Sequence, residues 1–144
     1  MLVNTTMAEL SDLTFRTAFI VYIVALILAF IYYGRVNSVI EARREALAEQ
    51  KVLVGAGGPE VVEKPKPDEA LIANARKWAG MTQALIWVGV ALHIVAFVTR
   101  GLAAGRFPLG NLYEYILFMT AVIMVVAAVV VQRKNWHTVW PWLL

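Results

Sequence analysis

Three runs of apolar residues, separated by polar stretches, divide this chain: 13–33, 81–99 and 112–131. An α-helix rises 1.5 Å per residue, so about 20 residues cross the roughly 30 Å of hydrocarbon in a bilayer. The pattern therefore predicts an all-α integral membrane domain over 1–144 with three transmembrane helices. The tryptophan-rich residues 136–144 indicate the start of a fourth span, and we expect the chain to be part of a longer protein.

The ends of the first two spans carry capping and interfacial residues. Ser11 or Asp12 is placed to cap the first helix. Tyr33 closes the first run and Trp78 precedes the second, and both are typical of a membrane surface. These positions agree with the span limits that the apolar runs predict.

The composition of the charged segment 34–80, between the first two spans, does not indicate a folded domain. Residues 39–51 have high helix propensity and opposite charges at helical spacing, so we interpret them as a solvated continuation of the first helix. By contrast, 55–68 contains three glycines and three prolines, which cannot propagate a helix. We expect a flexible linker there.

Composition and charge support a membrane class and predict its topology. Of the 144 residues, 60% are hydrophobic and 16% are charged, and there is no Cys for a disulfide or thiolate site. Ten of the 13 Lys and Arg residues lie in 34–80 or at the end of the third span. Since positive residues collect on the cytoplasmic side, the N-terminus and the turn 100–111 are predicted to be extracytoplasmic. The net charge of +3 follows from this topology and does not indicate nucleic-acid binding.

His93 is a polar residue inside the second span, where an unpaired polar group is costly. Two interpretations stay open. The ring hydrogen-bonds to another helix through Gln83, Tyr113 or Glu114, or it contacts haem or carries a proton. Gly89, one turn away on the same face, would let a neighbouring helix or a flat ligand approach closely.

The turn before the third span has a capping pattern. Asn111 and Glu114 have the spacing N-x-x-E, so Asn111 can cap the helix while Glu114 returns to free backbone donors. Pro108 stiffens the approach to this cap. Capping alone can account for both polar residues, and Arg100 and Arg106 can be interface anchors.

Motifs of known catalytic chemistry do not occur in this sequence. It has no Ser-His-Asp set and no phosphate-binding glycine loop. The predicted topology places His93 and His137 on opposite sides of the membrane, so they cannot share a metal ion. We therefore predict no catalytic residue and no metal site from motifs alone.

The segment A-F-V-T-R-G-L-A-A-G-R-F-P-L-G-N-L-Y-E-Y-I-L-F resembles a turn between early transmembrane helices of the CcsA/ResC family. This family, also called CcsB, is the membrane component of System II cytochrome c biogenesis. The matching pattern is an Arg past the span, followed by G-x-x-P-x-x-N-x-Y-E before an apolar helix. Its residues here are Arg100, Gly105, Pro108, Asn111, Tyr113 and Glu114.

The resemblance implies a haem-handling cytochrome c synthase of the bacterial cytoplasmic membrane. Its cofactor would be haem, with Arg100 or Arg106 available to pair with a propionate, and its partners would be apocytochrome c and a second System II membrane protein. His93 is a candidate haem contact from its position inside the second span and is not carried over from the family pattern. The family's tryptophan-rich hallmark with flanking haem-ligating His is not matched by Trp136, Trp140 and Trp142. This piece alone is therefore expected to be inactive.

A different class of function fits the same apolar pattern. The chain can be a non-catalytic membrane scaffold or an accessory subunit of a larger complex, with its spans used for packing and its turn used only as a cap. Haem binding distinguishes the two hypotheses, because a scaffold would bind none.

Overall fold

The computed structural model describes residues 4–55 and 69–144, and these residues form helices without a β-strand. The helices are α1 (Thr5–Gly55), α2 (Glu69–Ala104), α3 (Leu112–Lys134), the 3-10 helix η1 (His137–Val139) and α4 (Trp140–Leu143). Three of them, α1, α2 and α3, contain segments long and apolar enough to cross a membrane. The prediction of an all-α chain with three such helices is confirmed.

Both long helices extend well beyond their apolar runs. At 51 residues, α1 is about 75 Å long, more than twice the thickness of a bilayer core. Residues 39–51 continue α1, as predicted, and α2 begins at Glu69, well before the predicted second span 81–99. Most of the segment 34–80 is therefore helical, while 56–68 of the expected linker lies outside the described residues.

The start of α1 differs from the prediction. Asn4, rather than Ser11 or Asp12, caps the helix, because its Oδ1 accepts the Met7 N–H at 3.2 Å. Helix formation extends through 5–10 because none of these residues breaks it. Asp12 instead forms an exposed pair with Arg16 at 2.7 Å.

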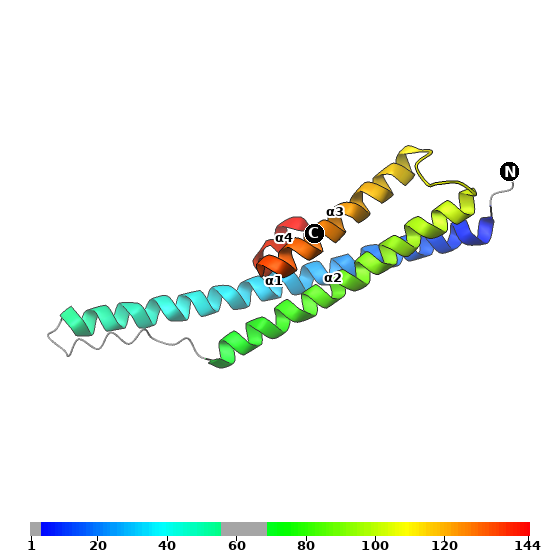
Figure 1. The fold of residues 1–144 in the computed structure, drawn as a ribbon. Helices are drawn as coiled ribbons and strands as arrows, with labels where there is room; N and C mark the ends of the chain where they lie inside the picture. The colour runs from blue at the N-terminus through cyan, green and yellow to red at the C-terminus, as the bar shows by residue number, and fades with distance from the viewer. Residues whose placement is uncertain (1–3, 56–68) are drawn as a thin grey trace.

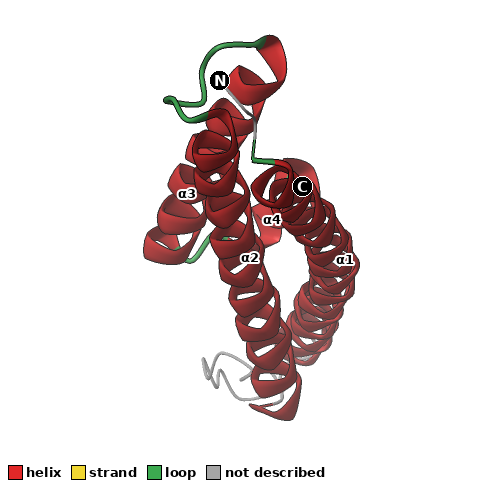
Figure 2. Cartoon of the chain, turned by 90° about the vertical axis from the view of Figure 1, so that its right-hand side faces the viewer, coloured by secondary structure: helices red, strands yellow, loops and turns green. Residues whose placement is uncertain are grey.

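An antiparallel hairpin of α1 and α2 is the body of the molecule, and α3 packs against it (Figure 1). The N-terminal end of α1 lies beside the C-terminal end of α2, where the Asn4 N–H donates to Ala103 O at 3.2 Å. The view in Figure 2 shows α3 on one side of α2 and α1 on the other. The turn between α2 and α3 is thus at the same end of the bundle as the N-terminus.

Small residues line the contact between α1 and α2 at a seven-residue spacing. On α1 the buried positions include Ser11, Ala18 and Ala25. On α2 every seventh residue from 75 to 103 is buried: Ala75, Thr82, Gly89, Ala96 and Ala103. Small side chains allow two helix backbones to approach closely, which is how helices associate where no hydrophobic driving force exists between them. We refer to these positions as the small-residue seam.

The C-terminal residues turn back onto the bundle. α3 ends at Lys134, and its C-cap Asn135 adopts a left-handed conformation with φ 53°. Trp140 is fully buried, and its Nε1–H donates to Gln83 Oε1 at 3.1 Å. Residues 137–143 form only a 3-10 turn and one α-helical turn, so the start of a fourth span stays a prediction.

Replacement of Ala96 by Leu is expected to destabilise the α1–α2 hairpin. Ala96 is fully buried in the seam, and extra methylenes in a close-packed contact cost about 1–3 kcal/mol. Thermal unfolding of the purified chain in detergent measures the loss. Ala91→Leu is the matched control, because Ala91 is exposed on the same helix. Equal stability of the two variants would contradict the seam.

Candidate functional site

The turn between α2 and α3 is shorter than the predicted turn 100–111. Arg100–Ala104 is helical, and α2 ends at Ala104 because Gly105 takes a left-handed φ of 60°. A glycine adopts this conformation without steric cost and commonly ends a helix. The Gly105 of the predicted motif therefore has a structural role, and the turn proper is 105–111.

Pro108 folds the turn back onto α2. The proline is buried and lies over Gly101, where an added Cβ would meet Pro108 Cδ at 3.0 Å. Gly101 thus provides the space that the proline ring occupies. This contact brings the second half of the turn close to the last turns of α2.

Asn111 caps α3 as predicted. Its backbone is extended, with φ −143° and ψ 166°, and its Oδ1 accepts the Glu114 N–H at 2.8 Å. The cap satisfies one of the backbone donors that a helix start leaves free. Asn111 therefore positions Glu114 in the first turn of α3.

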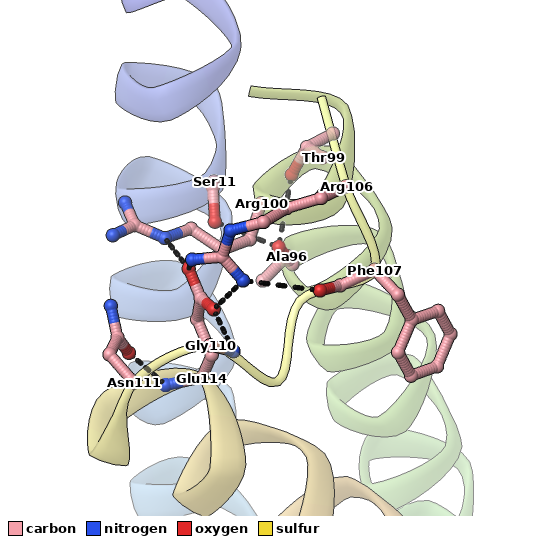
Figure 3. A network of polar contacts seen from close by, with 9 residues as sticks. All are labelled: Ser11, Ala96, Thr99, Arg100, Arg106, Phe107, Gly110, Asn111 and Glu114. Carbon is pink, nitrogen blue, oxygen red and sulfur yellow. Dashed lines mark hydrogen bonds and ion pairs between the residues drawn. The ribbon is translucent and has the colours of Figure 1, made fainter. Parts of the chain in front are cut away.

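Glu114 is the centre of a polar cluster at this turn (Figure 3). Its side chain is 1% exposed, and Oε2 accepts the Gly110 N–H at 2.8 Å and Arg106 Nη1–H at 3.0 Å. Arg106 Nη2 lies 3.4 Å from Oε1. The carboxylate thus returns to the backbone one residue earlier than the capping pattern predicts. It also closes the turn by an ion pair with Arg106.

Arg100 approaches the same carboxylate from α2. Its Nε lies 3.5 Å from Glu114 Oε1, close enough for an ion pair but without hydrogen-bond geometry. The guanidinium also stacks over the Tyr113 ring, with 5.4 Å from Cζ to the ring centroid. In Figure 3 the terminal nitrogens of Arg100 point away from the carboxylate. Two guanidinium groups face one carboxylate, so this cluster keeps one unit of positive charge.

Hydrogen bonds between polar groups hold α1 and α2 together at this end of the hairpin. Ser11 is 1% exposed, and its hydroxyl donates to Ala96 O at 2.7 Å. Thr99 Oγ1 lies 3.1 Å from the same carbonyl oxygen. The sequence interpretation of Ser11 as a helix cap missed this role. A buried hydroxyl in the seam is stable only with such a partner.

His93 lies two helical turns below Arg100 on the same face of α2, about 10 Å along the axis. Its side chain is 3% exposed. The Nε2 atom lies 3.4 Å from Thr120 Oγ1 of α3, so the contact across to another helix is with Thr120 rather than with Gln83, Tyr113 or Glu114. The Nδ1 atom is buried and has no hydrogen-bond partner.

Aromatic rings from α1 enclose His93. Phe15 and Tyr22 lie edge-on to the imidazole, with centroid separations of 5.6 and 6.3 Å. The Tyr22 ring also lies directly on Gly89, where an added Cβ would be 2.6 Å from Tyr22 Cε1. The expectation that Gly89 allows close approach is confirmed, and the group that approaches is a tyrosine ring of α1.

The structure brings together seven of the eight residues that the sequence singled out. The turn cluster contains Arg100, Gly105, Arg106, Pro108, Asn111, Tyr113 and Glu114. His93 is separate from this cluster and deeper in the bundle. The sequence interpretation missed Thr120, Phe15 and Tyr22, which contact His93 from α1 and α3, because nothing in the local pattern links them to it.

Comparisons with protein families, with curated proteins and with solved structures find no match for this chain.

Replacement of Glu114 by Gln is expected to loosen the turn 105–111. The two arginines would lose their shared carboxylate, and a hydrogen bond to a charged group contributes about 2 kcal/mol. Hydrogen exchange of the peptide covering 105–114 measures the effect, and we expect faster exchange in the variant. The matched control is Glu9→Gln, since Glu9 is exposed on α1. Unchanged protection would show that the carboxylate does not hold the turn.

Proposed function

We propose that this chain is the N-terminal part of a haem-handling cytochrome c synthase of the CcsA/ResC type. The observation that carries the proposal is the buried Nδ1 of His93, which has no hydrogen-bond partner inside a helix apolar enough to cross a membrane. An unpaired polar atom is costly in hydrocarbon. A ligand that accepts the nitrogen lone pair would remove that cost.

His93 would be the residue of this chain that holds haem iron, through its unpaired ring nitrogen. A neutral imidazole is a common haem ligand. Thr120 contacts the second ring nitrogen, and a contact of this kind holds the orientation of a ligating ring. His93 would therefore hold the iron, and Thr120 would be its positioning residue.

The excess positive charge at the turn suits the two carboxylate groups of haem. Glu114 neutralises only one of the two guanidinium groups, and the terminal nitrogens of Arg100 form no hydrogen bond with a described residue. Arginine binds carboxylates through paired hydrogen bonds. Arg100 would bind a propionate beside the turn, and Arg106 would do so through the exposed part of its side chain.

Partners and location follow from the same resemblance. Haem supplies the vinyl groups that this family joins to the Cys residues of apocytochrome c. The partners would be apocytochrome c and a second System II membrane protein, and the location would be the bacterial cytoplasmic membrane with the turn outside. The external haem ligands of the family lie beyond the matched segment, so 1–144 would accept or position haem without completing the attachment.

A membrane scaffold is the second candidate function, and one observation favours it. Every motif residue of the turn already has a structural partner: Gly105 ends α2, Pro108 packs on Gly101, and Asn111 caps α3. The arginines also pair with Glu114. A scaffold would use this rigid turn and the seam only to present its exposed apolar faces to other subunits.

Replacement of His93 by Gln is expected to lower haem affinity by more than about tenfold, because the iron would lose its nitrogen ligand. Titration of the detergent-purified chain with haemin, followed by its Soret absorbance, measures the affinity. His137→Gln is the matched control, since these are the two histidines of the chain. A chain that binds no haem, or two variants that bind equally, would favour the scaffold.

Replacement of Arg100 by Gln in the complete protein is expected to lower holocytochrome c formation several-fold at normal protein abundance. Glu114 keeps Arg106 and the Gly110 N–H as hydrogen-bond partners in this variant, so a loss at normal abundance would reflect the missing propionate contact. Haem staining of c-type cytochromes and immunoblotting of the variant give the two measurements. Arg16→Gln, which removes an exposed arginine of α1, is the control. Normal staining would contradict a role of Arg100 in haem binding.

A further inference from the structure

A cavity of about 630 Å³ lies between α1, α2 and the segment that follows α3. Its lining includes Tyr32, Gly80 and Asn135. These residues mark the ends of the three apolar runs, since Tyr32 is near the end of the first, Gly80 precedes the second and Asn135 caps α3. The cavity is therefore placed at a boundary between hydrocarbon and water, at the end of the bundle opposite to the turn 105–111.

The polar groups of this cavity have unused hydrogen-bonding capacity. Arg76 is exposed and makes no ion pair with a described residue, and the buried Nδ1 of His137 has no hydrogen-bond partner. The Tyr32 hydroxyl likewise hydrogen-bonds to none of the residues that the structure describes. Burial lowers the pKa of the His137 imidazole and so favours the neutral ring, which has one N–H donor.

The described lining of the cavity carries a positive charge and no negative one. The described lining contains Arg76 and no Asp or Glu. Arg133 and Lys134 end α3 immediately before Asn135. Basic residues beside a membrane surface attract anionic lipid headgroups, by about 1 kcal/mol for each Lys or Arg. The remaining lining residues are mostly apolar, such as Val36 and Ile72, which suits the glycerol and first methylene groups of a lipid.

We propose that this cavity binds the phosphate headgroup of an anionic phospholipid from the adjacent leaflet. Arg76 pairs with the phosphate, and the His137 ring and the Tyr32 hydroxyl hydrogen-bond to its oxygen atoms. The Tyr32 and His137 rings already lie edge-on at 6.3 Å between centroids. A lipid held there contacts the extended parts of α1 and α2 and the segment that follows α3. This inference does not depend on haem binding.

Binding is tested by native mass spectrometry of the full chain in detergent, titrated with phosphatidylglycerol and with phosphatidylcholine. We expect preferential retention of phosphatidylglycerol. Arg76→Gln should weaken this binding about fivefold, whereas Lys77→Gln, which removes the same charge from the next residue outside the cavity, should weaken it less than about twofold. Equal losses in the two variants would overturn the site and indicate general attraction to a basic surface.

A second pair of variants tests the cavity itself. Gly80 lines the cavity, and Gly34 does not. An added Cβ meets nothing within 4 Å at either glycine, so both tolerate a larger residue. Gly80→Leu is expected to occupy the cavity and abolish preferential retention, while Gly34→Leu should retain it. Retention by both variants would overturn the proposal.

Competition distinguishes a lipid from a soluble phosphate compound. Glycerol 3-phosphate carries the same phosphate group without acyl chains, and we expect millimolar concentrations to displace little phosphatidylglycerol. Complete displacement would show that the cavity recognises a soluble phosphate and would overturn the lipid assignment.

Discussion

Close contact between α1 and α2 is the constraint on which the rest of the structure depends. Ser11, Gly89 and Ala96 lie in the small-residue seam, and without it the Ser11 hydroxyl would not reach Ala96 O. The seam also places the Tyr22 ring on Gly89 and beside His93. The burial of the imidazole is therefore a consequence of helix packing. Any function of His93 requires that α1 and α2 stay at this separation.

The turn cluster depends on the Glu114 carboxylate. The Asn111 cap positions this carboxylate, and Arg100 and Arg106 pair with it. Glu114 enters α3 because Asn111 caps it, and the Gly110 N–H and Arg106 then bind its oxygens. Gly110 has a further requirement, because an added Cβ would collide with the Arg106 guanidinium. The capping and ion-pair roles are thus two parts of one arrangement. The positive charge that remains is what makes this end of the bundle suited to an anionic group.

Local sequence signals predicted the helices and the cap, and they failed where distant residues meet. The apolar runs predicted three spans, and N-x-x-E predicted the Asn111 cap, because both depend on residues within one helical turn or run. The predicted hydrogen-bond partners of His93 were wrong, since the residue that contacts it is Thr120 of another helix. The role of Ser11 was missed for the same reason. The seven-residue spacing from Ala75 to Ala103 was present in the sequence and would have indicated which face of α2 meets α1.

The length of α3 relates the two ends of the molecule to the membrane. With 23 residues it is about 35 Å long, close to the thickness of a bilayer core, whereas α1 and α2 extend past it. If α3 spans the hydrocarbon, the Glu114 cluster lies at one boundary and Asn135 at the other. His93 then lies inside the hydrocarbon, where it contacts Thr120 in the N-terminal half of α3. The cavity at Tyr32 and His137 lies at the second boundary. The length of α3 thus places the two histidines differently. The His93 imidazole would lie inside the hydrocarbon, where it could hold haem iron, and the His137 imidazole would lie at the interface, where it could bind a lipid phosphate.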